Sequence, residues 1–253
     1  MMNNVSMDNV SKDTLSLENI DKPKYRHEMK YLISSNEKQA MINRLGAVMK
    51  MDVNGSGAGY TIRSLYFDDY CYSAYEEKMA GTLERRKYRM RIYNFSDKVI
   101  KLECKQKQGN YIHKEAAGLK RDEAESILRG EYDFLLKREE KLCKEFYIEC
   151  MGNRMRPAVI VDYERAAFVF AQGDVRITFD DHVRSAWLGY DIFDERLPAY
   201  EVFEPETLIM EVKYTELLPE FVRRLVLPDN ARRMAASKYT LCLERKWEMT
   251  NGG

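Results

Sequence analysis

This chain lacks the features that mark several common classes of protein. Its 253 residues carry 41 basic and 41 acidic side chains, so it has none of the net positive charge of many non-specific nucleic-acid binders. Its five cysteines are odd in number and contain no CxxC pair, which favours free thiols over a disulfide framework. No apolar run approaches the length of a membrane span, and no apolar segment precedes a signal cleavage site. We therefore expect a reduced, cytoplasmic protein with no intrinsic membrane segment and no nucleic-acid partner.

The common nucleotide-binding and catalytic motifs are also missing. The sequence contains no GxxxxGK[ST], GxGxxG or GxSxG motif and no kinase-type HRD…DFG set. The Gly-flanked aromatic platforms of single-strand RNA binders are absent too. The three histidines are not spaced as a zinc site, although His113 and His182 share the strand parity of the charged residues described below. Any chemistry on a nucleotide must therefore use a site other than a P-loop.

Four short stretches instead alternate long charged residues with apolar ones. They are 24–30, 85–91, 101–107 and 211–213, and Lys and Arg dominate them, with a single carboxylate in three of the four. Successive side chains of a strand point to opposite faces, so each stretch places most of its charges on one side. This chemistry is typical of a polyphosphate site that also holds a divalent metal.

The rest of the chain alternates between strand-like and helix-like segments. Residues 1–22 are polar and predict a flexible leader, after which 23–247 is expected to form a single domain. Short connections and single helices between the strands predict an α+β fold, in which eight antiparallel strands close into a barrel flanked by helices. The predicted strands are 24–33, 60–69, 85–94, 98–107, 110–117, 158–171, 174–188 and 207–215. The predicted helices are 37–50, capped by Asn36, 70–80, one after Arg121, 131–150, 218–226 and 235–247.

One face of these strands carries a surplus of bases and is predicted to line the barrel. The alternative interpretation is an ordinary solvated outer face. The opposite face is apolar enough to pack beneath helices. The bases on the chosen face are Lys24, Arg26, Lys30, Arg63, Arg85, Lys87, Arg89, Arg91, Lys101, Lys105, Lys107, Arg165, Arg176, Arg184 and Lys213, and the acids are Glu28, Asp69, Glu103, Glu115, Asp174, Asp180 and Glu211.

In these segments the chain resembles the triphosphate tunnel metalloenzymes, and more closely the polyphosphate-polymerase domain of vacuolar transporter chaperone (VTC) proteins. The resemblance covers about residues 23–246. The superfamily's first-strand signature Glu-x-Glu-x-Lys corresponds to Arg26, Glu28 and Lys30, so the first Glu is replaced by Arg. This departure resembles the polymerase branch more than the cyclase and thiamine-triphosphatase branches. The other matching segments are Lys87-Tyr-Arg89-Met-Arg91, Leu102-Glu-Cys-Lys105, Asp162-Tyr-Glu-Arg165-Ala-Ala-Phe168, Met210-Glu-Val-Lys213 and Ser237-Lys-Tyr239.

Chemistry and resemblance together suggest roles for the charged residues. Arg89 and Arg91, two residues apart, are expected to grip adjacent phosphates, although pairing with Glu on neighbouring strands is the alternative. Glu211 is the best ligand for Mn²⁺ or Mg²⁺, because hard cations prefer carboxylate oxygen. The predicted catalytic residues are Arg89, Arg91, Arg165, Lys30 and Lys105; the substrate-binding residues are Lys238, Lys114, Arg26, Lys213 and Tyr163; and the metal ligands are Glu211, Glu28 and Glu103.

Five of these residues have alternative roles. Lys238 lies in a predicted helix, where a solvated lysine is the alternative to the tunnel position that the resemblance implies. The parity of Lys114 points away from the lumen unless a bulge intervenes. Glu28 and Glu103 could pair with lumen arginines instead of a metal. Tyr163 could orient Arg165 or pack in the core.

The resemblance implies a polyphosphate polymerase that transfers the γ-phosphoryl group of ATP to a growing inorganic chain. The same scaffold would also suit a hydrolase of triphosphate or short polyphosphate, with water as the acceptor. A binding module that holds a polyanion without catalysis is a third possibility. Glu211 argues against this third interpretation, because a pure anion trap gains nothing from a carboxylate.

Overall fold

A computed structural model describes residues 26–52, 59–109, 111–215, 217–226, 232–235 and 237–251 of the protein. The predicted leader, 1–22, lies outside the described residues. The strands are β1 (Arg26–Ser34), β2 (Lys50–Met51), β3 (Tyr60–Asp68), β4 (Glu84–Tyr93), β5 (Ser96–Gln108), β6 (Tyr111–Leu119), β7 (Arg156–Phe170), β8 (Val175–Ala186), β9 (Tyr200–Glu201), β10 (Thr207–Thr215) and β11 (Arg232–Arg233). The helices are α1 (Ser35–Leu45), α2 (Ser73–Met79), α3 (Arg121–Arg129), α4 (Lys141–Gly152), α5 (Glu220–Val226) and α6 (Lys238–Asn251), with 3-10 turns η1 (Asp133–Lys137) and η2 (Gln172–Asp174).

All of these strands join one antiparallel sheet. Its order is β11-β1-β10-β8-β7-β3-β4-β5-β6, with β2 added beside β7 and β9 beside β8. The α+β antiparallel fold is therefore confirmed. The ring of backbone hydrogen bonds that a closed barrel implies is not complete, because within the described part of the chain β6 pairs only with β5 and β11 only with β1. Side chains bridge the opening instead: the Lys105 ammonium on β5 lies 3.5 Å from the Glu28 carboxylate on β1.

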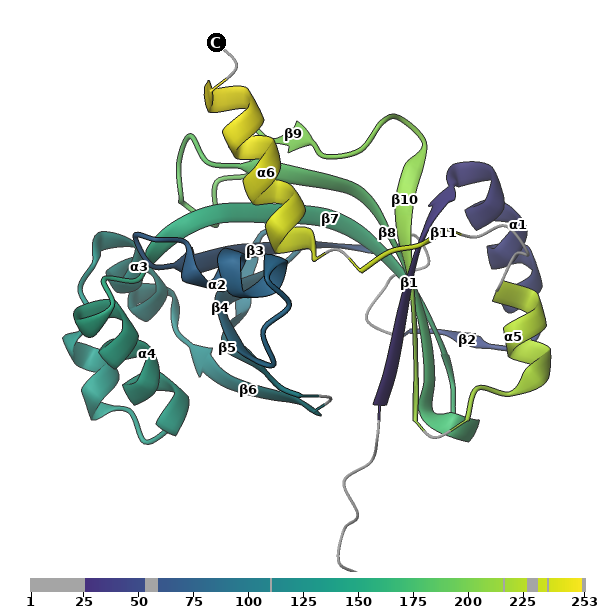
Figure 1. Ribbon diagram of the computed structural model, residues 1–253, viewed down its shortest axis with the longest axis horizontal. Helices are drawn as coiled ribbons and strands as arrows, with labels where there is room; N and C mark the ends of the chain where they lie inside the picture. Colours follow the sequence, from purple (N-terminus) through teal and green to yellow (C-terminus); the bar gives the residue numbers. More distant parts are fainter. Residues whose placement is uncertain are drawn as a thin grey trace, which may run out of the picture.

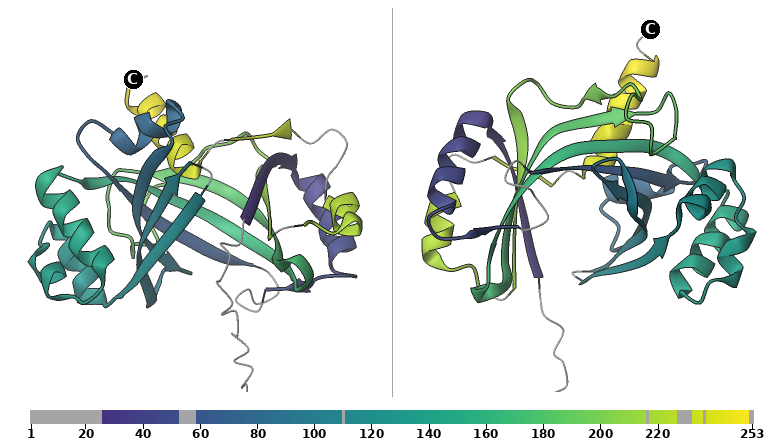
Figure 2. Two further views of the ribbon diagram at one scale, coloured as in Figure 1. Left: turned by 60° about the horizontal axis from the view of Figure 1, so that its bottom comes forward. Right: turned by 180° about the vertical axis from the view of Figure 1, so that it is seen from behind.

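The helices cover the two ends of the sheet and part of its middle. Figure 1 shows α1 and α5 together at one end, α3 and α4 at the other, and α6 crossing the central strands between them. The view from behind in Figure 2 shows the same separation. No helix within the described residues is long and apolar enough to cross a membrane.

Strand alternation divides the core between the two faces of the sheet. On one face, Met90 and Leu102 pack with Phe146 of α4, and at the other end Met210 and Ile177 pack with Leu45 of α1. The other face carries the charged residues of the predicted lumen and is called the lumen face below. There α6 packs over β3, β7, β8 and β10 and contributes the buried side chains Tyr239, Cys242 and Leu243.

Two helices differ from the sequence prediction. The helix predicted at 131–150 is a 3-10 turn followed by α4, with the break at residues 138–140. Helix α1 is capped by Ser34 and not by Asn36, because the Ser34 hydroxyl accepts a hydrogen bond from the Glu37 amide while the Glu37 carboxylate accepts one from the Ser34 amide.

The lumen parity predicted for β3 and for the end of β8 is wrong. Arg63 pairs with Asp162 at 2.7 Å on the face opposite to the lumen and donates to the carbonyls of Ile192 and Asp194. Its neighbour Ser64 is the residue that points into the lumen. A register shift between Asp162 and Glu164 changes which residues of the neighbouring part of β8 face the lumen. As a result, Arg184 contacts Glu164 outside the lumen, and the exposed His182 contacts Glu201.

Candidate polyanion-binding site

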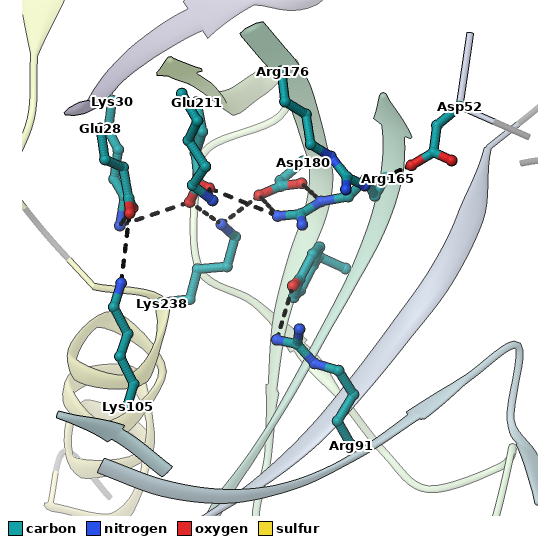
Figure 3. A network of polar contacts seen from close by, with 12 residues as sticks. Glu28, Lys30, Asp52, Arg91, Lys105, Arg165, Arg176, Asp180, Glu211 and Lys238 are labelled. Carbon is teal, nitrogen blue, oxygen red and sulfur yellow. Dashed lines mark hydrogen bonds and ion pairs between the residues drawn. The ribbon is translucent and has the colours of Figure 1, made fainter. Parts of the chain in front are cut away.

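Side chains from eight strands and one helix converge on the lumen face, and those of β3 and β6 are described below. The others come from β1, β10, β8 and β7 on one wall, from β4 and β5 on the other, and from the first turn of α6 (Figure 3). The ladder geometry explains the convergence, because directly paired residues of neighbouring strands point to the same side of a sheet. Glu28 is thus paired with Lys213, and Lys30 with Glu211.

Glu211 lies at the centre of the first wall. Its side chain is only 5% exposed, and its oxygens lie 2.7 Å from Lys213, 3.1 Å from Lys238, 3.6 Å from Lys30 and 3.8 Å from Arg165. Burial opposes its ionisation, but these four cations outweigh that cost and hold the pKa of Glu211 well below its ordinary value. The structure therefore brings together a carboxylate and four bases that the sequence predicted for one site.

Asp180 on β8 is a site residue to which sequence reasoning assigned no role. It is fully buried, accepts two hydrogen bonds from the Arg165 guanidinium at 2.6 and 2.7 Å, and forms an ion pair with Lys238. Burial acts to raise its pKa, but Arg165 and Lys238 lower it overall. Its parity on β8 placed it correctly among the lumen acids. Its function as the carboxylate that fixes Arg165 depends on the β7–β8 register, which pairs the two residues directly.

Glu28 connects the two walls of the lumen. Its carboxylate lies 3.2 Å from Lys30 on its own strand and 3.5 Å from Lys105 on β5. Burial would raise its pKa, but Lys213, Lys105 and Lys30 lower it to about 2. Burial also lowers the pKa of Lys105, against the opposing effect of Glu28. The side chain of the neighbouring Arg26 lies outside the described residues, so its predicted role in substrate binding stays a prediction.

Glu103 forms the centre of the second wall. Only 1% exposed, it accepts a hydrogen bond of 2.7 Å from Arg89, lies 3.8 Å from Arg91 and forms an ion pair with Lys114. Burial opposes ionisation, but Arg89, Arg91 and Lys114 lower its pKa to about 2. Its partners among the described residues are cations of β4 and β6, which is the arrangement of a residue that orients arginines.

Two residues of β3 and one of β7 complete the positioning of the arginines. Arg89 donates to the Tyr66 hydroxyl at 2.8 Å, and Arg91 donates to the Ser64 hydroxyl at 3.0 Å. Arg91 also donates to the Tyr163 hydroxyl at 3.3 Å. The Tyr163 ring lies beneath two further cations, with Arg165 5.1 Å and Lys238 4.8 Å from its centroid. Tyr163 therefore contacts cations from both walls and from α6.

Lys114 lies on the lumen face, contrary to the parity expected for β6. The β5–β6 hairpin pairs Gln108 with Tyr111, so odd positions of β5 face even positions of β6. Lys114 is thereby paired with Lys105. His113 and Glu115, which were expected to face the lumen, instead contact each other on the other face.

The three predicted metal ligands do not form one cluster. No group of three His, Cys, Asp or Glu side chains suited to a metal is found in the described segments. Glu28 and Glu211 share the Lys30 ammonium, whereas Glu103 belongs to the other wall. Thr178 on β8 is paired with Glu211 on β10, and its buried hydroxyl has no hydrogen-bond partner within the described residues. Two carboxylates and a hydroxyl fit a Mg²⁺ or Mn²⁺ ion whose other ligands are phosphate oxygens and water.

Comparison with known proteins agrees with this geometry. The VTC domain family model matches residues 25–245. The chain belongs to the VTC domain family. No curated protein matches the sequence of this VTC domain significantly.

Solved structures similar to this VTC domain come from a plant and from bacteria. A Hippeastrum protein described as a candidate adenylyl cyclase with dominant triphosphatase activity has a TM-score of 0.52 at 11% identity, over 87% of this chain and 96% of that one. A candidate adenylate cyclase from Vibrio parahaemolyticus has a TM-score of 0.49 at 13% identity, over 86% and 97% of the two chains. A similar protein from Bacillus halodurans has a TM-score of 0.45 at 12% identity, over 90% and 89%. At 11% identity, the likeness to the Hippeastrum protein is one of fold.

Proposed function

We propose that this protein is a polyphosphate polymerase, which transfers the γ-phosphoryl group of ATP to an inorganic polyphosphate chain with the help of Mn²⁺ or Mg²⁺. The observation that carries the proposal is the arrangement around Glu211 and Glu103. Two carboxylates on facing walls each contact several cations, and the Lys105–Glu28 ion pair links the two walls. Membership of the VTC domain family supports the same class of substrate.

Each cation has a distinct task in this mechanism. Arg89 and Arg91, held by Glu103, Tyr66 and Ser64, would bind non-bridging oxygens of the transferring phosphoryl group from one side. Arg165, held by Asp180, would bind from the opposite wall. Because their partners fix the guanidinium groups before reaction, little reorganisation is needed when charge develops in the transition state.

The lysines would neutralise the rest of the polyanion. Lys30, Lys105, Lys114, Lys213 and Lys238 each contact a carboxylate of the lumen face, and each would exchange part of that contact for phosphate oxygens. A divalent ion held by Glu211 and Glu28, with Thr178 beside them, would supply further charge neutralisation on the phosphates.

A hydrolase of triphosphate is the second candidate, and the low pKa values of the carboxylates in the site favour transfer. The pKa values of Glu28 and Glu103 are lowered to about 2, and those of Asp180 and Glu211 are also lowered. Carboxylates with such low pKa values are weak general bases for activating water. A polyphosphate acceptor is already an anionic nucleophile and needs no such base.

The test is to incubate purified protein with ATP and Mn²⁺ or Mg²⁺ and to separate the products on a gel. Long polyphosphate chains would support the polymerase, and free phosphate alone would support the hydrolase. Arg89→Ala should reduce turnover on the order of 10²-fold or more, as for loss of one transition-state donor. The exposed Arg129→Ala on α3 serves as the matched control and should leave turnover unchanged. If the protein binds polyphosphate but turns over neither ATP nor triphosphate with either metal, a binding module is the correct interpretation.

A further inference from the structure

Three lysines form a row across β4, β5 and β6 on the lumen face. Lys87 is paired with Lys105 in the β4–β5 ladder, and Lys105 is paired with Lys114 in the β5–β6 ladder. Like charges placed directly opposite one another destabilise a sheet, so such a row needs compensation. Lys105 contacts Glu28 and Lys114 contacts Glu103. Lys87 differs from both, because it contacts a hydroxyl and an aromatic ring.

The contacts of Lys87 place its ammonium group at the first turn of α6. It donates a hydrogen bond of 3.1 Å to the Ser237 hydroxyl and lies 5.0 Å from the centroid of the Tyr239 ring. Arg89, two residues along the same strand, faces the same side of the sheet. Lys87 therefore lies on the lumen face one step beyond the proposed reacting centre.

The groups that act on Lys87 from the surrounding elements are other cations. They are Lys78 on α2, Arg85 on β4, Lys105 on β5 and Lys30 on β1. Burial and then these four charges lower the pKa of Lys87 to about 7. The Tyr239 hydroxyl is bonded to Asp68, and burial raises the pKa of this tyrosine, so α6 offers Lys87 no anion there. A polyanion beside Lys87 would supply the missing negative charge.

We propose that Lys87 is a further substrate-binding residue, which contacts a phosphoryl group adjacent to the one held by Arg89 and takes up a proton when the polyanion binds. This inference rests on the proposed function and deepens it. It assigns the row of Lys87, Lys105 and Lys114 to a neighbouring phosphate of the chain. It also predicts that binding becomes coupled to pH through Lys87.

Two shifts in the pKa of Lys87, one in the free protein and one on binding, determine whether protons are taken up or released. With a pKa of about 7, Lys87 is mostly neutral at pH 8 before the ligand binds. Phosphate oxygens favour the charged ammonium and so raise its pKa. Binding of tripolyphosphate at pH 8 should therefore take up protons, and the uptake should decline toward pH 6, where Lys87 is already protonated.

Calorimetry with tripolyphosphate tests this on the full chain. Titrations at pH 8 and pH 6, each in two buffers of different ionisation enthalpy, give the number of protons bound. Lys87→Met should weaken binding roughly tenfold or more, as for loss of a charge-assisted hydrogen bond, and should reduce proton uptake at pH 8. Lys87→Arg should retain much of the affinity but lose the same part of the proton uptake, because a guanidinium stays charged. Lys246→Met is the matched control, since Lys246 is a partly buried lysine of α6 that lies over Tyr72 and bonds to the Ala158 carbonyl.

Each outcome separates this inference from the function on which it rests. Wild-type protein that binds tripolyphosphate and forms polyphosphate, with the same proton uptake as Lys87→Arg, would overturn the role of Lys87 and leave the polymerase intact. Equal affinities of Lys87→Met and the wild type would do the same. A wild-type protein that binds no tripolyphosphate would overturn both proposals. Lys246→Met should match the wild type in affinity and in proton uptake, and an equal loss there would mean that the effect of Lys87→Met is structural.

Discussion

Every carboxylate at the centre of the lumen face contacts more than one cation, and this arrangement determines what a single substitution does. Asp180 holds Arg165 and Lys238, Glu103 holds Arg89 and Lys114, and Glu211 contacts four bases. Removing such a carboxylate leaves buried cations without their partner. The resulting loss of stability can exceed what the ion pair itself contributed.

Glu211→Gln tests the function of the carboxylate at the centre of the site. The amide keeps the shape of the side chain but removes the charge that a divalent ion needs, so metal-dependent turnover should nearly vanish. Tripolyphosphate should still bind, because the repelling carboxylate is gone while Lys30, Lys213 and Lys238 stay. The measurements are turnover with Mn²⁺ and the tripolyphosphate dissociation constant. Retained turnover, or a loss of binding that parallels the loss of turnover, would contradict Glu211 as the metal ligand.

At the scale of elements, one glycine determines how the chain enters β3 beside strand β7, which carries Arg165. Gly59 has φ +94°, and a Cβ added to it would lie 2.7 Å from the Arg165 carbonyl oxygen. The backbone of β3 therefore passes close to the residue whose guanidinium is aligned with Asp180. A side chain at Gly59 would push this part of β7 away.

Gly59→Ala should lower the free energy of unfolding by about 1–3 kcal/mol, as expected for a strained backbone. It should also reduce turnover, because Arg165 shifts with its backbone. Urea denaturation and the polymerase assay measure the two effects. The control is Gly152→Ala at the end of α4, where an added Cβ meets nothing within 4 Å. Equal stabilities of the Gly59 and Gly152 variants would show that the close approach imposes no constraint.

The element scale is also where the sequence was most informative. All eight long strands lie within two residues of their predicted bounds, because alternation over nine or more residues leaves a clear signal. The two-residue strands β2, β9 and β11 are too short to show any period. Side-chain direction was harder to predict: the β5–β6 hairpin register reversed the expected face of Lys114, and the register shift near Asp162 moved Arg184 outside. Individual contacts such as Arg165 with Asp180 require the pairing of two strands, which one strand's pattern does not contain.

In the whole molecule, the basic and acidic side chains are equal in number but unevenly distributed. The 41 bases and 41 acids cancel in total, yet bases outnumber acids in the proposed site. Carboxylates with lowered pKa values hold the cations of each wall, and one of them, Glu28, connects the two walls of a sheet whose backbone ladder is not closed. Their ionisation should therefore contribute to the stability of the whole fold.

The pH dependence of unfolding tests this contribution. Glu28 and Glu103 have pKa values of about 2 in the folded protein, against an ordinary value of 4.5. A group whose pKa is lowered by folding stabilises the fold above its unfolded pKa, and the stabilisation is lost as pH falls toward the folded pKa. The free energy of unfolding should thus fall between pH 5 and pH 2.5, by an amount on the order of a few kcal/mol. Urea denaturation at several pH values measures this.

Surface carboxylates also titrate in this range, so a variant must isolate the buried ones. Glu103→Gln should be less stable than the wild type at pH 6 but should lose less stability on acidification, because one of the shifted groups is gone. Glu195→Gln changes an exposed carboxylate and should keep the wild-type slope. The idea fails if Glu103→Gln and Glu195→Gln show the same dependence on pH. In that case the pKa of Glu103 would not be lowered by folding. The proposal that a charged Glu103 preorganises Arg89 and Arg91 would then fail.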